Sequence, residues 1–147
     1  MRKGVIFVDL DNLYIINNHV NVKVLKARVE YIKKLDCRTY WFGNDYTHNI
    51  VLKNKVDIDM INSKIETNSA DHNLINYMLK TKNPNALVIT GDNTLCKLAA
   101  FINEDKKVRF AKFAGNDMVP VDVDYNFKTR EHLMKFIQSL ALYLNRC

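Results

Sequence analysis

The chain has 147 residues, of which 48% are hydrophobic and 26% charged, which is typical of one globular domain with one core. No apolar run approaches the roughly 20 residues that a membrane-spanning helix needs, so we expect no membrane partner. The net charge of +6 favours a polyanionic partner such as nucleic acid, although many basic domains use such charge only for solubility.

The N-terminus and the cysteines both favour an intracellular protein. Arg2 and Lys3 precede only a very short apolar stretch that ends in acids, unlike a secretory signal. The 3 cysteines form no CxxC pair, so they indicate neither a zinc site nor a disulfide framework. We therefore expect a single cytoplasmic domain over residues 1–147.

Four apolar runs predict buried strands, and the segments between them have helical periodicity. The strands are expected at residues 5–8, 38–42, 86–90 and 108–113. The last run alternates and is therefore expected closer to an edge, and residues 56–65 form a weaker candidate. Strands that alternate with helices predict an α/β fold with a mostly parallel sheet.

Apolar stripes with a spacing near 3.6 residues predict the helices. Three stripes fall within residues 25–32, 74–79 and 95–102, and a C-terminal helix is expected at about 129–145. Residues 114–125 have no regular pattern. The C-terminal stripe is expected to pack within the chain, and the alternative is packing against a second copy in a homodimer.

The first predicted strand runs directly into Asp9, Asp11 and Asn12. Aspartate is a poor strand residue and costs much to bury unpaired, so we expect these side chains where the strand ends and the sheet opens to water. In open α/β sheets that carboxyl edge is where ligands bind. The segment therefore predicts an acidic, metal-binding site at the end of a central strand.

Two further acids are expected near Asp9. Asp92 follows the third strand, and parallel strands end on the same side, so the two acids share one edge if their strands are neighbours. Asp71 lies in the first turn of a helix begun near Ser69 and shares the apolar face of that helix. Three converging carboxylates repel one another, and Mg²⁺ or Mn²⁺ with oxygen ligands relieves that repulsion.

Each acid also has a purely structural interpretation. Asp71 would favour a helix N-terminus electrostatically, and Asp92 or Asn93 would cap the helix that follows. Asp11 and Asn12 would shape a turn through local hydrogen bonds. The convergence of three acids on one edge is what favours a metal site.

The ordered set of motifs resembles the PIN-like nuclease domains, and especially their NYN branch. Residues 9–12 match an Asp-x-x-Asn pattern after the first strand, and residues 68–75 resemble the acidic start of a mid-domain helix. Residues 90–95 match the first half of a Ser/Thr-Gly-Asp-x-Asp-Phe motif. The resemblance covers about residues 4–115 and implies a three-layer α/β/α sandwich with a mostly parallel sheet of about five strands.

The resemblance implies metal-assisted hydrolysis of phosphodiester bonds, usually in RNA. Asp9, Asp71 and Asp92 would hold Mg²⁺ or Mn²⁺, Asn12 would contact the phosphate or a metal-bound water, and Asp11 would be a secondary ligand. Further substrate contacts would come from Lys64, Lys97, Thr90 and Thr94.

The sequence departs from the family pattern at Thr94 and Leu95, which stand where a second aspartate and an aromatic residue are expected. Glu66 or Asp117 would then supply a fourth carboxylate, and the sequence does not choose between them. With a degenerate site, the domain would instead be a non-catalytic binding or assembly module.

A third interpretation comes from the same first motif. Asp9 and Asp11 also resemble the Asp-x-Asp signature of haloacid-dehalogenase-like phosphatases, with Asp9 as nucleophile and Asp11 as general acid/base. Asn12 departs from that pattern, and Cys96 stands where a second late acid is expected. The nuclease interpretation is therefore preferred.

Overall fold

The computed structural model describes residues 4–61, 69–80, 85–102, 107–122 and 138. The predicted C-terminal helix at about 129–145 lies outside these ranges except for residue 138. No helix within the described ranges is long and apolar enough to cross a membrane.

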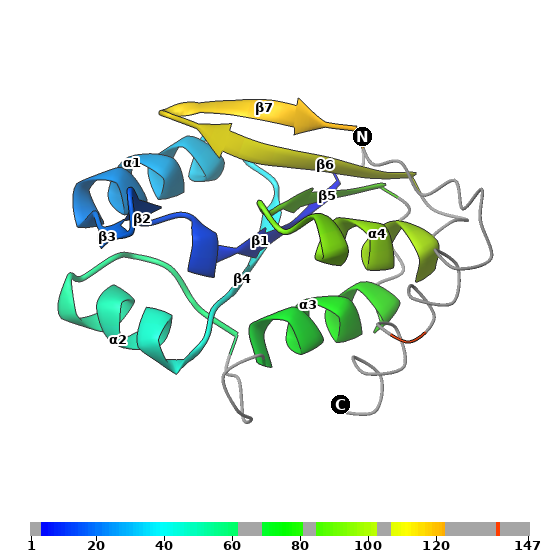
Figure 1. Cartoon of the computed structure of the whole chain (residues 1–147), viewed down its shortest axis with the longest axis horizontal. Coiled ribbons are helices and arrows are strands. Elements are labelled where there is room, and N and C mark those ends of the chain that lie inside the picture. The colour runs from blue at the N-terminus through cyan, green and yellow to red at the C-terminus, as the bar shows by residue number, and fades with distance from the viewer. Residues whose placement is uncertain (1–3, 62–68, 81–84, 103–106, 123–137, 139–147) are drawn as a thin grey trace.

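A five-stranded sheet lies at the centre of the fold, with the strand order β4-β1-β5-β6-β7 (Figure 1). β1 (Val5–Asp9) pairs in parallel with β4 (Arg38–Phe42) and with β5 (Asn85–Ile89). β6 (Lys107–Ala114) is parallel to β5, and β7 (Asp117–Val121) runs antiparallel at the edge. The α/β class and the mostly parallel sheet are therefore confirmed.

The strand predictions succeeded where the apolar runs were strongest and failed at the edge. All four predicted strands are present, and β6 lies next to the edge strand. Residues 114–125, expected to be irregular, contain β7, whose Pro120 suits only an edge strand. In the described part of the 56–65 candidate, the pairing is a single bridge between Met60 and Trp41.

Four helices are described, and three of them were predicted. α1 (Val22–Lys33), α3 (Ser69–Lys80) and α4 (Asn93–Ile102) follow the apolar stripes. α2 (Asp45–Lys53) was missed, because its nine residues bury little beyond Thr47, Ile50 and Val51. Too few apolar positions recur in so short a segment to reveal a period of 3.6 residues.

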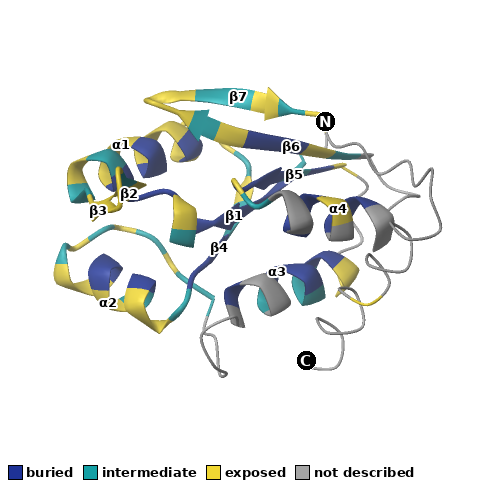
Figure 2. Cartoon of the chain, in the orientation of Figure 1, coloured by how far each residue is buried: buried dark blue, intermediate teal, exposed yellow. Residues whose placement is uncertain are grey.

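The two faces of the sheet carry separate apolar clusters. Side chains alternate along β1, so Phe7 packs with α3 and α4 while Val8 packs with α1 and α2. All five residues of β1 are buried (Figure 2), which explains the continuous apolar run before Asp9. Burial of each large apolar side chain contributes about 1.5–3 kcal/mol.

A short excursion follows β1 before α1 begins. A 3₁₀ turn, η1 (Leu10–Asn12), leads into a hairpin of β2 (Ile15–Ile16) and β3 (His19–Val20). The two connecting residues, Asn17 and Asn18, have φ angles of 50° and 64°. Asparagine tolerates this left-handed conformation, as a two-residue hairpin turn requires.

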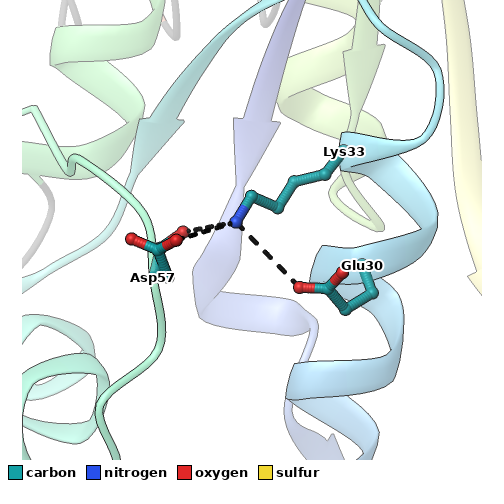
Figure 3. Close-up of polar contacts among 3 residues, drawn as sticks. All are labelled: Glu30, Lys33 and Asp57. Atoms are coloured by element: carbon teal, nitrogen blue, oxygen red, sulfur yellow. Dashed lines mark hydrogen bonds and ion pairs between the residues drawn. The ribbon is translucent and has the colours of Figure 1, made fainter.

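The end of α1 is tied to the segment that follows α2 (Figure 3). The Lys33 ammonium donates to the Asp57 carbonyl at 2.9 Å and lies 3.4 Å from the Asp57 carboxylate and 4.0 Å from Glu30. These groups are solvent-exposed, so each ion pair contributes about 0–1 kcal/mol. The contact positions the chain between α2 and Met60 more than it stabilises the fold.

Candidate functional site

Asp9 is a buried carboxylate at the end of the central strand. It is 3% exposed and follows Phe7 on the face that α3 and α4 cover. Its Oδ2 accepts hydrogen bonds from Thr90 Oγ1 at 2.8 Å and Asn12 Nδ2 at 3.3 Å, and its Oδ1 accepts from the Asp11 amide at 3.3 Å. These donors offset the cost of burying a charge and fix the orientation of the carboxylate.

Thr90 holds Asp9 through a hydroxyl whose direction is determined. The Asp92 amide donates to Thr90 Oγ1 at 3.1 Å, so the hydroxyl proton is directed at Asp9. Thr90 is only 2% exposed, and its own amide donates to the Ala111 carbonyl. Thr90 therefore orients Asp9 from a buried position, and its contact with substrate stays a prediction.

Asp92 immediately precedes α4 and caps it. Its Oδ1 accepts from the Leu95 amide at 3.2 Å, and its carbonyl accepts from the Cys96 amide at 3.1 Å. The capping interpretation, left open by the sequence, is therefore confirmed. Capping engages one carboxylate oxygen with a backbone amide, an arrangement that is compatible with metal ligation by the same carboxylate.

Asp9 ends β1, and Asp92 follows the neighbouring strand β5. β1 and β5 are adjacent and parallel, so both acids lie at the same sheet edge. Burial, together with the smaller effect of the negative charges of Asp92 and Asp9, raises the pKa of the Cys96 thiol to about 11. Two carboxylates therefore lie within electrostatic range of one buried thiol.

Asp11 faces α2. Its Oδ1 accepts from the Asn44 amide at 3.0 Å and from Thr47 Oγ1 at 2.6 Å. Because Thr47 donates to Asp11, the Tyr14 hydroxyl must donate to Thr47, at 2.8 Å. Burial raises the pKa of Tyr14, the bond to Thr47 lowers it, and the charge of Asp11 raises it. Asp11 thus anchors the N-terminus of α2, where negative charge is favourable.

A glycine allows this anchor to form. A Cβ added to Gly43 would lie 2.7–2.9 Å from side-chain carbons of Thr47 and 2.6 Å from Met60 Cε. The sequence did not lead us to this network, because α2 was not predicted. The available signal was Asn44 three residues before Thr47, since Asn44 caps α2 by accepting from the Thr47 amide at 2.9 Å.

Arg28 is a buried cation that supports the segment after the acids. It is 5% exposed, and Nη1 donates to the Leu13 carbonyl at 2.9 Å. Its Nη2 and Nε donate to the Gly115 carbonyl at 2.8 and 3.2 Å, and the guanidinium lies 5.2 Å from the centre of the Phe113 ring. Burial lowers the pKa of Arg28. The sequence signal for it was an arginine at an apolar position of α1, next to Val29.

The remaining predicted site residues lie on β7 and α4 or outside the described ranges. Asp117 is exposed at the start of β7, three strands from β1, and Lys97 is exposed on α4. The described part of the chain does not include Lys64 or Glu66. It includes the backbone but not the side chains of Asp71, in the first turn of α3, and Thr94, in the first turn of α4.

The carboxylates of Asp9 and Asp92 could supply some, but not all, of the ligands of a hard divalent cation. Among the described residues, no group of three or more His, Cys, Asp or Glu could hold a metal ion. Asp9 and Asp92 supply carboxylate oxygens at one edge, and Mg²⁺ is commonly bound by one or two carboxylates with waters and substrate phosphate completing its shell. Asp71 belongs to the helix packed on the same face.

A cavity lies at the opposite edge of the sheet. Its volume is about 540 Å³, and it is lined by the first residues of β1 and β5 together with Leu35, Cys37 and Arg109. None of the predicted site residues lines it, so the acidic edge and this cavity are separate features.

Comparisons of the chain with protein-family models, with curated proteins and with solved structures found no match. The functional assignment therefore depends on the geometry of the acidic edge.

Proposed function

We propose that this protein is a metal-dependent nuclease of the PIN-like type that hydrolyses phosphodiester bonds in RNA. One observation carries the proposal: Asp9 is buried, is oriented by Thr90, and shares its sheet edge with Asp92, which follows the adjacent parallel strand. A carboxylate held in this way at a sheet edge suits a metal ligand better than a surface charge.

Asp9, Asp92 and Asp71 would hold Mg²⁺ or Mn²⁺, which when bound supplies an activated water and stabilises charge on the phosphate. Thr90 fixes the orientation of Asp9 by hydrogen bonding to Oδ2. Asn12 is exposed beside Asp9, where its amide can reorient towards a phosphate oxygen. Asp11 acts indirectly, because its hydrogen bonds hold the turn that carries Asn12 against α2.

The same proposal extends to the architecture and the setting of the protein. Apolar clusters on opposite faces of the sheet support a three-layer α/β/α sandwich. The net charge of +6 supports an RNA partner. We place the protein in the cytoplasm, with self-association through the C-terminal helix as the alternative to intramolecular packing.

A second candidate is a binding module with a degenerate site. Thr94 stands where the PIN-like pattern has an acid, which favours this alternative. The phosphatase interpretation receives less support, because Asp11 Oδ1 already accepts two hydrogen bonds from the α2 region. A general acid/base must instead exchange its proton with the substrate.

The test is cleavage of single-stranded and structured RNA in Mn²⁺ or Mg²⁺ by the wild-type chain and by Asp9→Asn. We expect Asp9→Asn to remain folded by circular dichroism and to lose more than about 100-fold in cleavage rate. Mutation of a residue that only hydrogen-bonds to a metal ligand already lowers activity by about 10–100-fold. Asp117→Asn is the matched control, because it removes an exposed carboxylate three strands away.

Absence of cleavage of any RNA with either metal would remove the nuclease proposal and leave the binding module. Equal activity of Asp9→Asn and Asp117→Asn would show that the cleavage comes from elsewhere. Release of phosphate from a monoester through an aspartyl-phosphate would favour the phosphatase.

A further inference from the structure

A lysine lies on the same face of the sheet as Asp9. Side chains alternate along β6, so Lys112 shares the face of Phe110, which packs in the cluster formed with α3 and α4. Asp9 shares that face through Phe7. The two charged residues therefore point to the same side of the sheet.

Lys112 is also level with Asp9 along the strands. Ile89 of β5 pairs with Val8 of β1 on one side and with Ala111 of β6 on the other. The next residue of each strand therefore lies in one row across the sheet. That row contains Asp9, Thr90 and Lys112. The hydrogen bond from Thr90 to Asp9 and that from the Thr90 amide to the Ala111 carbonyl confirm the alignment.

The position and exposure of Lys112 leave its charge available. Two strand spacings separate β1 from β6, which corresponds to about 10 Å between backbones. The side chain is exposed, and no carboxylate of the described residues forms an ion pair with it. Its long, flexible stem can carry the ammonium towards the acidic end of the row or out to solvent.

A phosphodiester that approaches Asp9 and Asp92 meets two negative charges. A cation on the far side of the phosphate offsets that repulsion and orients the strand. The N-terminus of α4, which directly follows the intervening strand β5, adds a partial positive charge on the same face. Lys112 is the described cation that combines this row, this face and exposure.

We propose that Lys112 binds a backbone phosphate of single-stranded RNA at this edge of the sheet. The inference rests on the proposed function for its ligand, but binding of RNA can be measured without cleavage. Lys112 acts here as a substrate-binding residue, with the acids supplying the metal side of the site.

The experiment measures the affinity of a short, labelled single-stranded RNA of mixed sequence in EDTA across a range of salt concentrations. It uses the full chain, Lys112→Ala, Lys112→Arg and the control Lys26→Ala. Lys26 is an exposed lysine of α1, on the opposite face of the sheet, so both alanine variants change the net charge equally. Thermal unfolding of each variant checks that the fold is intact.

Loss of one phosphate contact on a single strand lowers the slope of log affinity against log salt by about 0.7. This change in slope corresponds to an affinity roughly fivefold weaker than that of the wild-type chain at 0.1 M salt. We expect both changes in Lys112→Ala, recovery of the slope in Lys112→Arg, and no comparable change in Lys26→Ala.

The outcomes separate this proposal from the nuclease proposal. If the wild-type chain cleaves RNA but both alanine variants have the same salt slope, Lys112 is not a phosphate ligand and the nuclease stands. If only Lys112→Ala loses slope and no metal supports cleavage, Lys112 binds RNA in a non-catalytic module. If the wild-type chain binds no RNA in EDTA, the Lys112 proposal fails, and the cleavage assay with metal alone decides the nuclease proposal.

Discussion

The hydroxyl of Thr90 donates to the carboxylate of Asp9 across 2.8 Å and so joins the ends of two adjacent parallel strands. Both residues are almost completely buried. Because the Asp92 amide occupies the oxygen of Thr90 as an acceptor, the hydroxyl cannot rotate away without loss of a second bond. The orientation of Asp9 is therefore built into the backbone turn that follows β5.

Thr90→Val should expose the importance of this bond, because it keeps the shape of the side chain and removes the hydroxyl. We expect a loss of about 1–3 kcal/mol in the free energy of unfolding, since a buried charge loses a donor and a backbone amide loses its acceptor. Urea denaturation measures the change. Thr90→Ser keeps the hydroxyl and should recover most of it, and equal losses in both variants would indicate a packing effect.

Asp11→Ala should destabilise the protein by roughly 1–3 kcal/mol, because Asn44 and Thr47 both lose their acceptor. Thr47→Val removes one of these bonds and also the acceptor of the buried Tyr14 hydroxyl, so it should cost a comparable amount. The measurement is urea denaturation, followed by RNA cleavage at a temperature where all variants are folded. We expect Asp11→Asn to retain far more cleavage than Asp9→Asn, and the reverse order would support a direct chemical role for Asp11.

Arg28→Met should cost about 1.5–3 kcal/mol in the free energy of unfolding, because the carbonyls of Leu13 and Gly115 lose charged donors inside the fold. Methionine preserves most of the apolar stem. Arg28→Lys keeps the charge but lacks the planar fork that reaches both carbonyls, so partial recovery is expected. Full stability of Arg28→Met in thermal unfolding would contradict this role.

The stability of the protein should decrease at alkaline pH through Cys96. Its pKa is raised from 9.0 to about 11, so the folded state holds the proton more tightly than the unfolded state. The contribution is complete below pH 9 and is lost as the pH rises towards 11, with an upper size of about 3 kcal/mol. Chemical denaturation in EDTA across this interval should give a steeper decline for wild type than for Cys96→Ala, and parallel declines would refute the assignment.

Divalent metal should stabilise the folded protein if the acidic edge binds it. Saturation at 100 times the dissociation constant adds about 2.7 kcal/mol to the free energy of unfolding. Thermal unfolding with Mn²⁺ and after EDTA measures the effect. Asp9→Asn should abolish the shift while Asp117→Asn keeps it, and an equal shift in both variants would place the metal elsewhere.

The sequence predicted the core of this fold because the relevant signals are local. The apolar run of residues 5–8 is buried on both faces, and the stripe of α1 has a clear period. β7 was not predicted because Pro120 interrupts its pattern, and α2 was not predicted because it buries few side chains. The edge shared by Asp9 and Asp92 followed from strand order alone, once β1 and β5 proved adjacent.

The hydrogen-bond partners of Asp9 and Asp11 could not be predicted from the sequence. Thr90 and Asp9 are separated by 81 residues, and Asp11 and Thr47 by 36. No local pattern indicates which hydroxyl reaches which carboxylate, because such pairings follow from tertiary packing.

The turn after β1 also has a consequence for how the protein is made. Asp9 bonds to Thr90, which is 81 positions away. Leu13 bonds to Arg28, which in turn reaches Gly115, 87 positions further along the chain. Contacts of such long sequence separation form late in folding, because loop closure must precede them. Asp9 and Asp11 therefore acquire their final geometry only once Asn44, Thr47 and Thr90 have packed against them, and a fragment that ends before β5 should not retain the site.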